Sequence, residues 1–207
     1  MKKINFNDRY GLTQAVIEGR KTMTRRLVSD RLWEIWTNYD DFCNSVIGGI
    51  ARDGTSVSRE YYHECDFFKD KCRYKVGEVV AVAQCYYNAF SSRCDIPVYG
   101  ADRTPGWLNK MFVRADLMPH QIRITGIRCE RLQDISDEDC MKEGVVDVTY
   151  FKSGGRPYEL FALPGHEYEE TFNTPRQAFA ALIDKVSGRG TWDRNPWVVV
   201  YEFELVK

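Results

Sequence analysis

The chain has 207 residues, of which 43 % are hydrophobic and 14 % aromatic, enough for one domain with a sizeable core. Its 29 basic and 30 acidic residues nearly cancel, which excludes a globally basic nucleic-acid coat but permits a local basic pocket. No apolar run approaches the roughly 18 residues of a membrane helix, and the opening residues do not resemble a signal peptide. The seven scattered cysteines indicate no disulfide framework, so we expect a cytoplasmic protein with no membrane partner.

The N-terminal segment predicts a strand, a short helix and a second strand. Residues 3–6 are typical of a short strand. Apolar residues recur at i, i+3 and i+4 from Leu12, which predicts a helix within 10–19 that Gly19 ends as its C′ cap. Residues 20–28 contain threonines and no helical periodicity, so a turn into a strand is expected there.

The middle of the chain alternates between exposed segments and buried strands. Residues 30–42 could form one amphipathic helix. The rest of the segment 29–75 is expected to be an exposed insertion that has room for one hairpin. Residues 78–84 predict a buried strand, and 88–121 are rich in loops. The stretch "QIRITGIRCERL" alternates as a strand does, and Gly126 within it suggests a β-bulge.

The C-terminal part contains the clearest helix signals. Ser136 is a natural N-cap before three acidic residues, and Gly144 ends that helix. After a second excursion, 145–173, Thr174 begins a helix with a proline at its first position. "NPWVVVYEFELV" then alternates as a closing strand. Long strands with few intervening helices favour an α+β fold built on a small closed or partly open barrel.

Common catalytic and metal-binding patterns are missing from the sequence. It has no Walker A, GxGxxG, GxSxG or HExxH motif. His63, Cys65 and Cys72 form one loose ligand group, whereas zinc sites usually show two tight pairs. We therefore expect neither a metal nor another cofactor.

The stretch "EGRKTMTRRL" concentrates polar chemistry at the end of the first helix. Either it is a solvated turn, or it forms a pocket for an anionic, hydrogen-bonding ligand. A threonine becomes a nucleophile only if a base takes its proton, and a lysine can act as that base when burial or nearby cations lower its pKa. Arg25 and Arg26 would supply such cations. Because Lys21 and Thr24 would point to opposite faces of a regular strand, they converge only if Lys21 lies in the turn after Gly19.

The pattern G-x-K-x-x-T-x-R, formed by Gly19, Lys21, Thr24 and Arg26, resembles the signature of the ASCH domain family. That family is related to the PUA-like RNA-binding barrels. "YKVGEVVAV", "IRITGIRCERLQDISDEDCMKEGV" and "NPWVVVYEFELV" are similar to further blocks of the family. The combination resembles the longer ASCH proteins of phages and prophages.

The resemblance implies a single ASCH domain over 1–207. Its fold would be a PUA-like mixed or antiparallel β-barrel with flanking helices and insertions at about 29–75, 88–121 and 145–173. The function it implies is binding of RNA or of a modified nucleoside, with a ribonuclease as a further alternative.

Some small family members are similar to amidohydrolases that remove the acetyl group of N4-acetylcytidine. Their catalytic Lys, Thr and Glu correspond here to Lys21, Thr24 and Glu143, with Glu138 or Asp139 as alternatives for the acid. In that reading the lysine takes the threonine proton, the threonine oxygen attacks the acetamide carbonyl, and the acid serves the leaving nitrogen.

The remaining candidate site residues are expected to contact the ligand. Gly19 and Arg25 would border the pocket, and Arg26 would hold an oxyanion or a phosphate. Trp192, in the glycine-rich stretch "GRGTWDRNP", is a candidate for stacking on a base. If the stretch forms a functional pocket, Lys21→Ala is expected to abolish hydrolysis and leave folding intact, because a lysine in a surface turn contributes little to stability.

Overall fold

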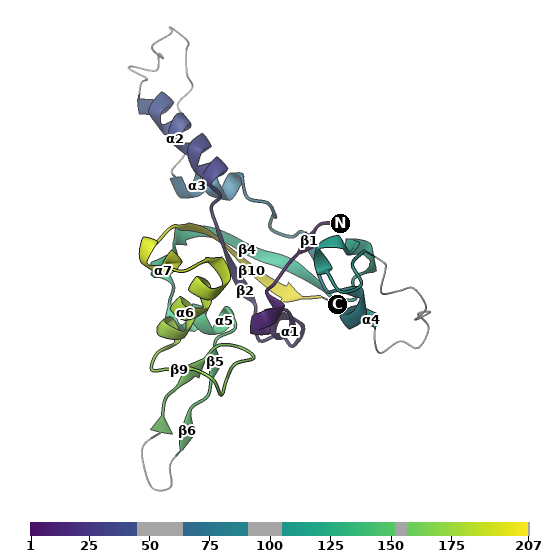
Figure 1. Ribbon diagram of the computed structural model, residues 1–207. Coiled ribbons are helices and arrows are strands. Elements are labelled where there is room, and N and C mark those ends of the chain that lie inside the picture. The colour runs from purple at the N-terminus through teal and green to yellow at the C-terminus, as the bar shows by residue number, and fades with distance from the viewer. Residues whose placement is uncertain (45–63, 91–104, 152–156, 207) are drawn as a thin grey trace.

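The computed structural model describes residues 1–44, 64–90, 105–151 and 157–206. Its centre is a five-stranded mixed sheet in the order β1-β3-β4-β10-β2, in which β1 runs parallel to β3 and the other neighbours are antiparallel (Figure 1). The strands are β1 (Lys3–Ile4), β2 (Met23–Leu27), β3 (Val79–Val82), β4 (Gln121–Arg131) and β10 (Trp197–Leu205).

Helices and small sheets surround this central sheet. The helices are α1 (Leu12–Ile17), α2 (Asp30–Asn44), α3 (Glu64–Asp70), α4 (Tyr86–Phe90), α5 (Asp137–Lys142), α6 (Pro175–Ser187) and α7 (Thr191–Arg194). The short strands are β5 (Val146–Asp147), β6 (Tyr150–Phe151), β7 (Pro157–Tyr158), β8 (Phe161–Ala162) and β9 (Thr171–Phe172). Single 3-10 turns form η1 (Asp8–Tyr10), η3 (Lys110–Phe112), η4 (Ala115–Leu117) and η5 (Leu132–Asp134). Figure 1 shows α2 with α3 and the β6 end projecting away from the sheet. None of the described helices is both long and apolar enough to cross a membrane.

The predicted helix boundaries are confirmed by their hydrogen bonds. The Ser136 hydroxyl accepts the N–H of Asp139 at 3.1 Å, and the Thr174 hydroxyl accepts the N–H of Gln177 at 3.2 Å. Each bond satisfies one of the amides that the first turn of a helix leaves free. Local chemistry alone therefore positions the starts of α5 and α6.

Two predicted glycine features are also confirmed. Gly19 follows α1 with φ +74°, the left-handed conformation that glycine adopts without a steric penalty. The ladder between β4 and β10 shifts register between Glu202 and Phe203, opposite Gly126, where the sequence suggested a bulge.

Helix α3 was not expected from the sequence, which suggested only an exposed excursion there. Phe67 and Phe68 of this helix are buried against Trp36 of α2, with ring centroids 5.1 and 6.0 Å apart. The helix is thus stabilised by an aromatic cluster from a distant segment, which local patterning does not reveal. The region suggested for a hairpin lies mostly outside the described residues.

The α+β class is confirmed, whereas no closed barrel is found in the described residues. β1 and β2 are the two edges of the sheet and do not pair with each other there. A side chain spans the gap instead: the Arg26 guanidinium of β2 donates to the carbonyl oxygen of Asn5, just after β1. Because β1 contributes only two paired residues, it offers little backbone to close a ladder.

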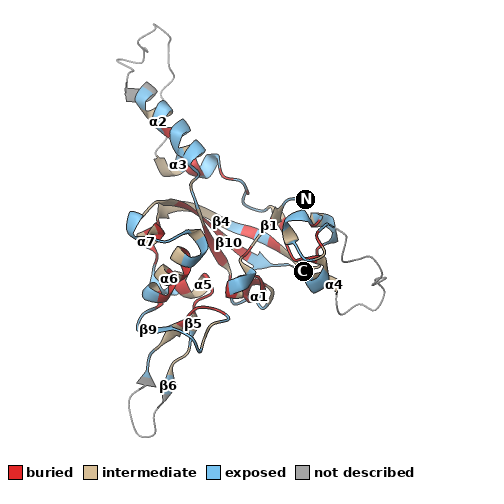
Figure 2. Ribbon diagram, in the orientation of Figure 1, coloured by how far each residue is buried: buried red, intermediate tan, exposed pale blue. Residues whose placement is uncertain are grey.

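The main core fills the space between the sheet and the covering helices. Buried residues gather along β10 and on α1 and α6, whereas most of α2 is exposed (Figure 2). The helix α1 and the end of α5 therefore meet near the start of β2, where the polar stretch of the sequence lies.

Candidate functional site

Lys21 lies in the turn between α1 and β2, as the sequence argument required. Its backbone N–H donates to the carbonyl oxygen of Ala15 at 2.9 Å. The next amide, of Thr22, donates to the carbonyl oxygen of Lys142 at the end of α5 at 3.0 Å. These two bonds hold the lysine between the first helix and α5.

A buried ion pair joins Lys21 to Glu143. The Lys21 Nζ atom lies 2.5 Å from Glu143 Oε2 and 2.7 Å from the Glu143 carbonyl oxygen. The lysine is 2 % exposed and the glutamate 4 %. Gly144 follows this glutamate with a φ of +106°, a backbone conformation that favours glycine, and a Cβ added there would make ordinary contact with the Lys21 side chain.

Burial lowers the pKa of Lys21 below that of a free lysine. The neighbouring Arg26 and Arg25 cations act in the same direction, whereas the Glu143 carboxylate opposes the change without cancelling it. A lysine with a lowered pKa is a better proton acceptor near neutral pH.

The two arginines of the motif have different surroundings. Arg25, with its side chain 1 % exposed, contacts the carboxylates of Glu130 at 2.6 Å, Asp139 at 3.0 Å and Glu143 at 3.2 Å. Its charge is therefore neutralised and its position fixed.

Arg26 has no carboxylate within ion-pair distance in the part of the chain that the structure describes. Its guanidinium donates to Asn5 and lies 5.7 Å from the ring centroid of Phe6. Burial is the main cause that lowers its pKa. Arg26 is partly buried, and a partly buried cation without a counter-ion favours an anionic ligand.

These side chains border a cavity of about 270 Å³. Thr24 is 5 % exposed and lines it, and its hydroxyl makes no hydrogen bond to any other described residue. The structure shows no direct hydrogen bond between Lys21 and Thr24; the two are brought to one cavity. Its polar lining consists of Asn7, Lys21, Thr24, Arg25, Arg26, Glu143 and Ser187, and its apolar lining of Phe6, Leu12, Leu27, Phe179, Leu182, Ile183 and Val186.

Of the three acids considered at α5, Glu143 alone lines this cavity. The Glu138 side chain is 78 % exposed and pairs with Lys142 at 2.6 Å. Asp139 is bound to Arg25 and, at 2.5 Å, to Arg128. Glu143, which follows the last residue of α5, is thus the one of these three acids that lies beside Lys21 in the cavity.

Gly19 and Trp192 do not line the cavity. Gly19 shapes the turn, and an added Cβ would meet nothing within 4 Å. Trp192 packs edge-on against Phe179 with centroids 6.2 Å apart, and the Arg176 guanidinium lies 5.2 Å above its ring. Its indole therefore supports a residue of the cavity wall from behind.

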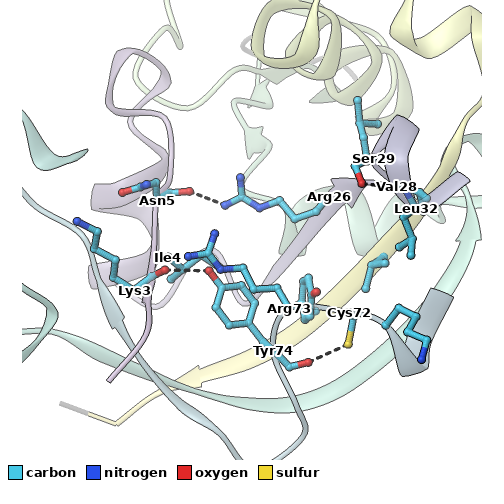
Figure 3. A pocket seen from close by; sticks show the side chains of 14 residues that line it. Lys3, Ile4, Asn5, Arg26, Val28, Ser29, Leu32, Cys72, Arg73 and Tyr74 are labelled. Carbon is cyan, nitrogen blue, oxygen red and sulfur yellow. Dashed lines mark hydrogen bonds between the residues drawn. The ribbon is translucent and has the colours of Figure 1, made fainter. Parts of the chain in front are cut away.

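A second, larger cavity of about 530 Å³ was not expected from the sequence. It lies between the two edge strands and the segment after α3, and is referred to below as the edge cleft (Figure 3). The cations Lys3, Arg26, Lys71 and Arg73 line it together with Tyr74. The interleaved basic and aromatic residues of "KCRYK" are the signal that could have indicated it.

Metal-ligating side chains do not cluster in the described residues, where no group of three or more His, Cys, Asp and Glu could hold an ion. Cys65 and Cys72 are free thiols, and His63 lies outside that part of the chain.

No family model matches the chain, and no curated protein or solved structure matches it significantly.

Proposed function

We propose that the cavity around Lys21 binds a nucleoside with an acylated exocyclic amine and that the chain hydrolyses this amide bond. The observation that carries the proposal is a buried Lys21–Glu143 pair beside a cavity-lining Thr24 hydroxyl with no hydrogen-bond partner among the described residues. Pairs of buried ionisable groups that line a concave pocket are typical of acid–base sites. We further propose that the chain is an ASCH protein of PUA-like ancestry whose barrel is left open at one edge.

The reaction begins with proton transfer. The Lys21 proton passes to Glu143 along their 2.5 Å hydrogen bond when a ligand excludes water, which leaves a neutral amine. That amine takes the Thr24 proton as the threonine oxygen attacks the amide carbonyl carbon.

The tetrahedral intermediate then collapses by breaking the carbon–nitrogen bond. The leaving nitrogen takes a proton from the lysine ammonium or from Glu143, and the acyl group remains as a threonine ester. Water hydrolyses this ester, so that the carboxylic acid and the free amine are the products. Arg26 stabilises the oxyanion that forms during both steps.

Substitution of the nucleophile tests this mechanism. Incubation with N4-acetylcytidine and other acylated nucleosides, followed by chromatography, should show turnover by the wild type. Thr24→Val should lower kcat by about a hundredfold or more without changing the fold, because it removes the attacking oxygen and keeps the side-chain shape. Thr24→Ser should retain part of the activity.

Thr22→Val is the matched control, because Thr22 lies two positions away and does not line the cavity. It should leave kcat unchanged. Full activity of Thr24→Val on every substrate that the wild type accepts would rule out the threonine nucleophile.

Binding of RNA without catalysis is a second candidate function. It is favoured by the Arg26 cation, which lacks a carboxylate partner in the described part of the chain, and by the neighbouring basic cleft. RNA binding through phosphates should weaken with salt, with a logarithmic slope proportional to the phosphates contacted. Binding or turnover of a neutral nucleoside should respond little to salt.

A further inference from the structure

The edge cleft concentrates positive charge where the sheet is left open. It is bordered by residues 3–5 of the β1 edge, 26–29 of the β2 edge and 71–74 of the connection from α3 to β3. Four of the residues that line it are cationic, and the described part of the lining contains no carboxylate. An unneutralised concave surface of this kind attracts an anion.

The four cations differ in how far they are already engaged. Lys3 Nζ donates to the carbonyl oxygens of Met111 and Val113, at 2.8 and 2.7 Å. Lys71 lies 3.4 Å from the carboxylate of Asp70 and is half exposed. Arg73 has neither a carboxylate partner nor a side-chain hydrogen bond within the described ranges. Arg26 also has no carboxylate partner there, and its bond to the Asn5 carbonyl oxygen uses only one of its five N–H groups.

Arg26 and Arg73 reach the same part of the cleft. Figure 3 shows the Arg73 guanidinium beside the Tyr74 ring and the Arg26 guanidinium pointing toward Asn5 on the same side of the cleft. Arg73 lies 5.5 Å from that ring centroid, and its charge contributes to lowering the pKa of Arg26. Two like charges in a cleft repel each other, and an anion bound between them offsets this repulsion. The planar guanidinium groups of an arginine pair are well shaped to donate to phosphate oxygens.

The edge cleft adjoins the cavity around Lys21. Arg26 and Leu27 line both spaces. On the opposite side, Asn5 borders the cleft and Phe6 the cavity. The bond from Arg26 to the Asn5 carbonyl oxygen thus marks the boundary between them.

We propose that the edge cleft binds a phosphate group attached to the nucleoside in the Lys21 cavity, so that the substrate class is a nucleotide rather than a free nucleoside. This inference rests on the proposed function for the occupant of the cavity. Arg73 and Arg26 hold the phosphate oxygens. The segment 3–7, which borders the cleft at one end and the cavity at the other, lies along the ligand.

Calorimetric titration tests the inference. The probes are N4-acetylcytidine, its 5′- and 3′-monophosphates, an acetylated cytidine dinucleotide and inorganic phosphate, each added to the Thr24→Val protein to prevent turnover. At least one phosphorylated probe should bind at least about tenfold more tightly than the nucleoside, because a charge-assisted contact is gained. Arg73→Gln should remove this gain and leave the affinity for the nucleoside unchanged.

Arg9→Gln is the matched control. Arg9 is also an exposed arginine stacked on the tyrosine that follows it, 5.8 Å from the Tyr10 ring, but it does not line the cleft. It should keep the gain. A dinucleotide that binds more tightly than both monophosphates would identify an RNA chain as the source of the phosphate.

Equal affinity for nucleoside and nucleotides would overturn the inference, as would a gain that Arg73→Gln and Arg9→Gln reduce equally. Arg73-dependent binding of inorganic phosphate without any binding of the nucleoside would support the phosphate site and overturn only the proposed function.

Discussion

Removing the charge of Glu143 should destabilise the fold far more than removing that of its helix neighbour Glu138. The substitution Glu143→Gln leaves the Lys21 ammonium buried, with only the carbonyl oxygen at 2.7 Å and a neutral amide as acceptors. Breaking a buried ion pair on one side costs about 3–5 kcal/mol. Arg25 keeps two other carboxylates, so a loss of about 3 kcal/mol is expected, at the lower end of that range.

Equilibrium unfolding in urea at pH 6 measures this loss, and Glu138→Gln is the control. Glu138 belongs to an exposed pair with Lys142, so its replacement should cost less than about 1 kcal/mol. The double variant Lys21→Met with Glu143→Gln removes both charges. It should be about 2 kcal/mol more stable than the sum of the single losses predicts.

The penalty in Glu143→Gln should decrease as pH rises. Without the carboxylate, the Lys21 pKa in the folded state falls still further below that of the unfolded chain. Between those two values the unfolded state binds more protons, so the free energy of unfolding increases with pH. A loss below 1 kcal/mol at pH 6, or additive losses in the double variant, would refute the view that Lys21 and Glu143 form a coupled buried pair.

Three further outcomes follow from the site and the core. The alkaline limb of the kcat/KM profile should move to higher pH in Arg26→Gln, because Arg26 helps to lower the Lys21 pKa and the reaction starts from the Lys21 ammonium; an unmoved limb would contradict a proton supplied by Lys21. Gly144→Ala should cost at least about 1 kcal/mol in urea unfolding, since φ is +106° there; an unchanged midpoint would show that the backbone relaxes freely. Iodoacetamide at pH 8 should modify Cys140 only after unfolding, because burial raises its pKa to about 12; peptide mass mapping that finds it modified as fast as Cys65 would disprove this.

Burial also changes what a Lys21→Ala experiment means. The sequence suggested a surface turn in which this change leaves folding intact, whereas the lysine is 2 % exposed and paired. Without Lys21, Arg25 is the remaining ion-pair partner of the buried Glu143 carboxylate among the described residues. A loss of activity in Lys21→Ala could therefore come either from the missing catalytic amine or from a destabilised fold. Thr24→Val separates the two effects, because it removes no charge.

Local signals in the sequence determined the elements that carry the site. Ser136 and Thr174 begin their helices because a hydroxyl can accept an amide of the first turn. Gly19 ends α1 because glycine tolerates a positive φ, and this places Lys21 in a turn and Thr24 in the following strand. These interactions span only a few residues, so they can be predicted from neighbours alone.

Only the tertiary structure decided which charges meet. Lys21 and Glu143 are 122 residues apart. From the sequence, Glu138 and Asp139 stayed open as alternatives to Glu143, because only the packing of the end of α5 against the turn decides which acid meets Lys21. Arg25 and Arg26 are adjacent and chemically identical, yet one lies among three carboxylates and the other between two cavities. Adjacent residues of a strand point to opposite faces of the sheet, so the sequence predicts that the two arginines have different surroundings. Which groups surround each arginine depends on the elements that pack on that face. The edge cleft likewise arises from strands that remain apart, a property that no single segment encodes.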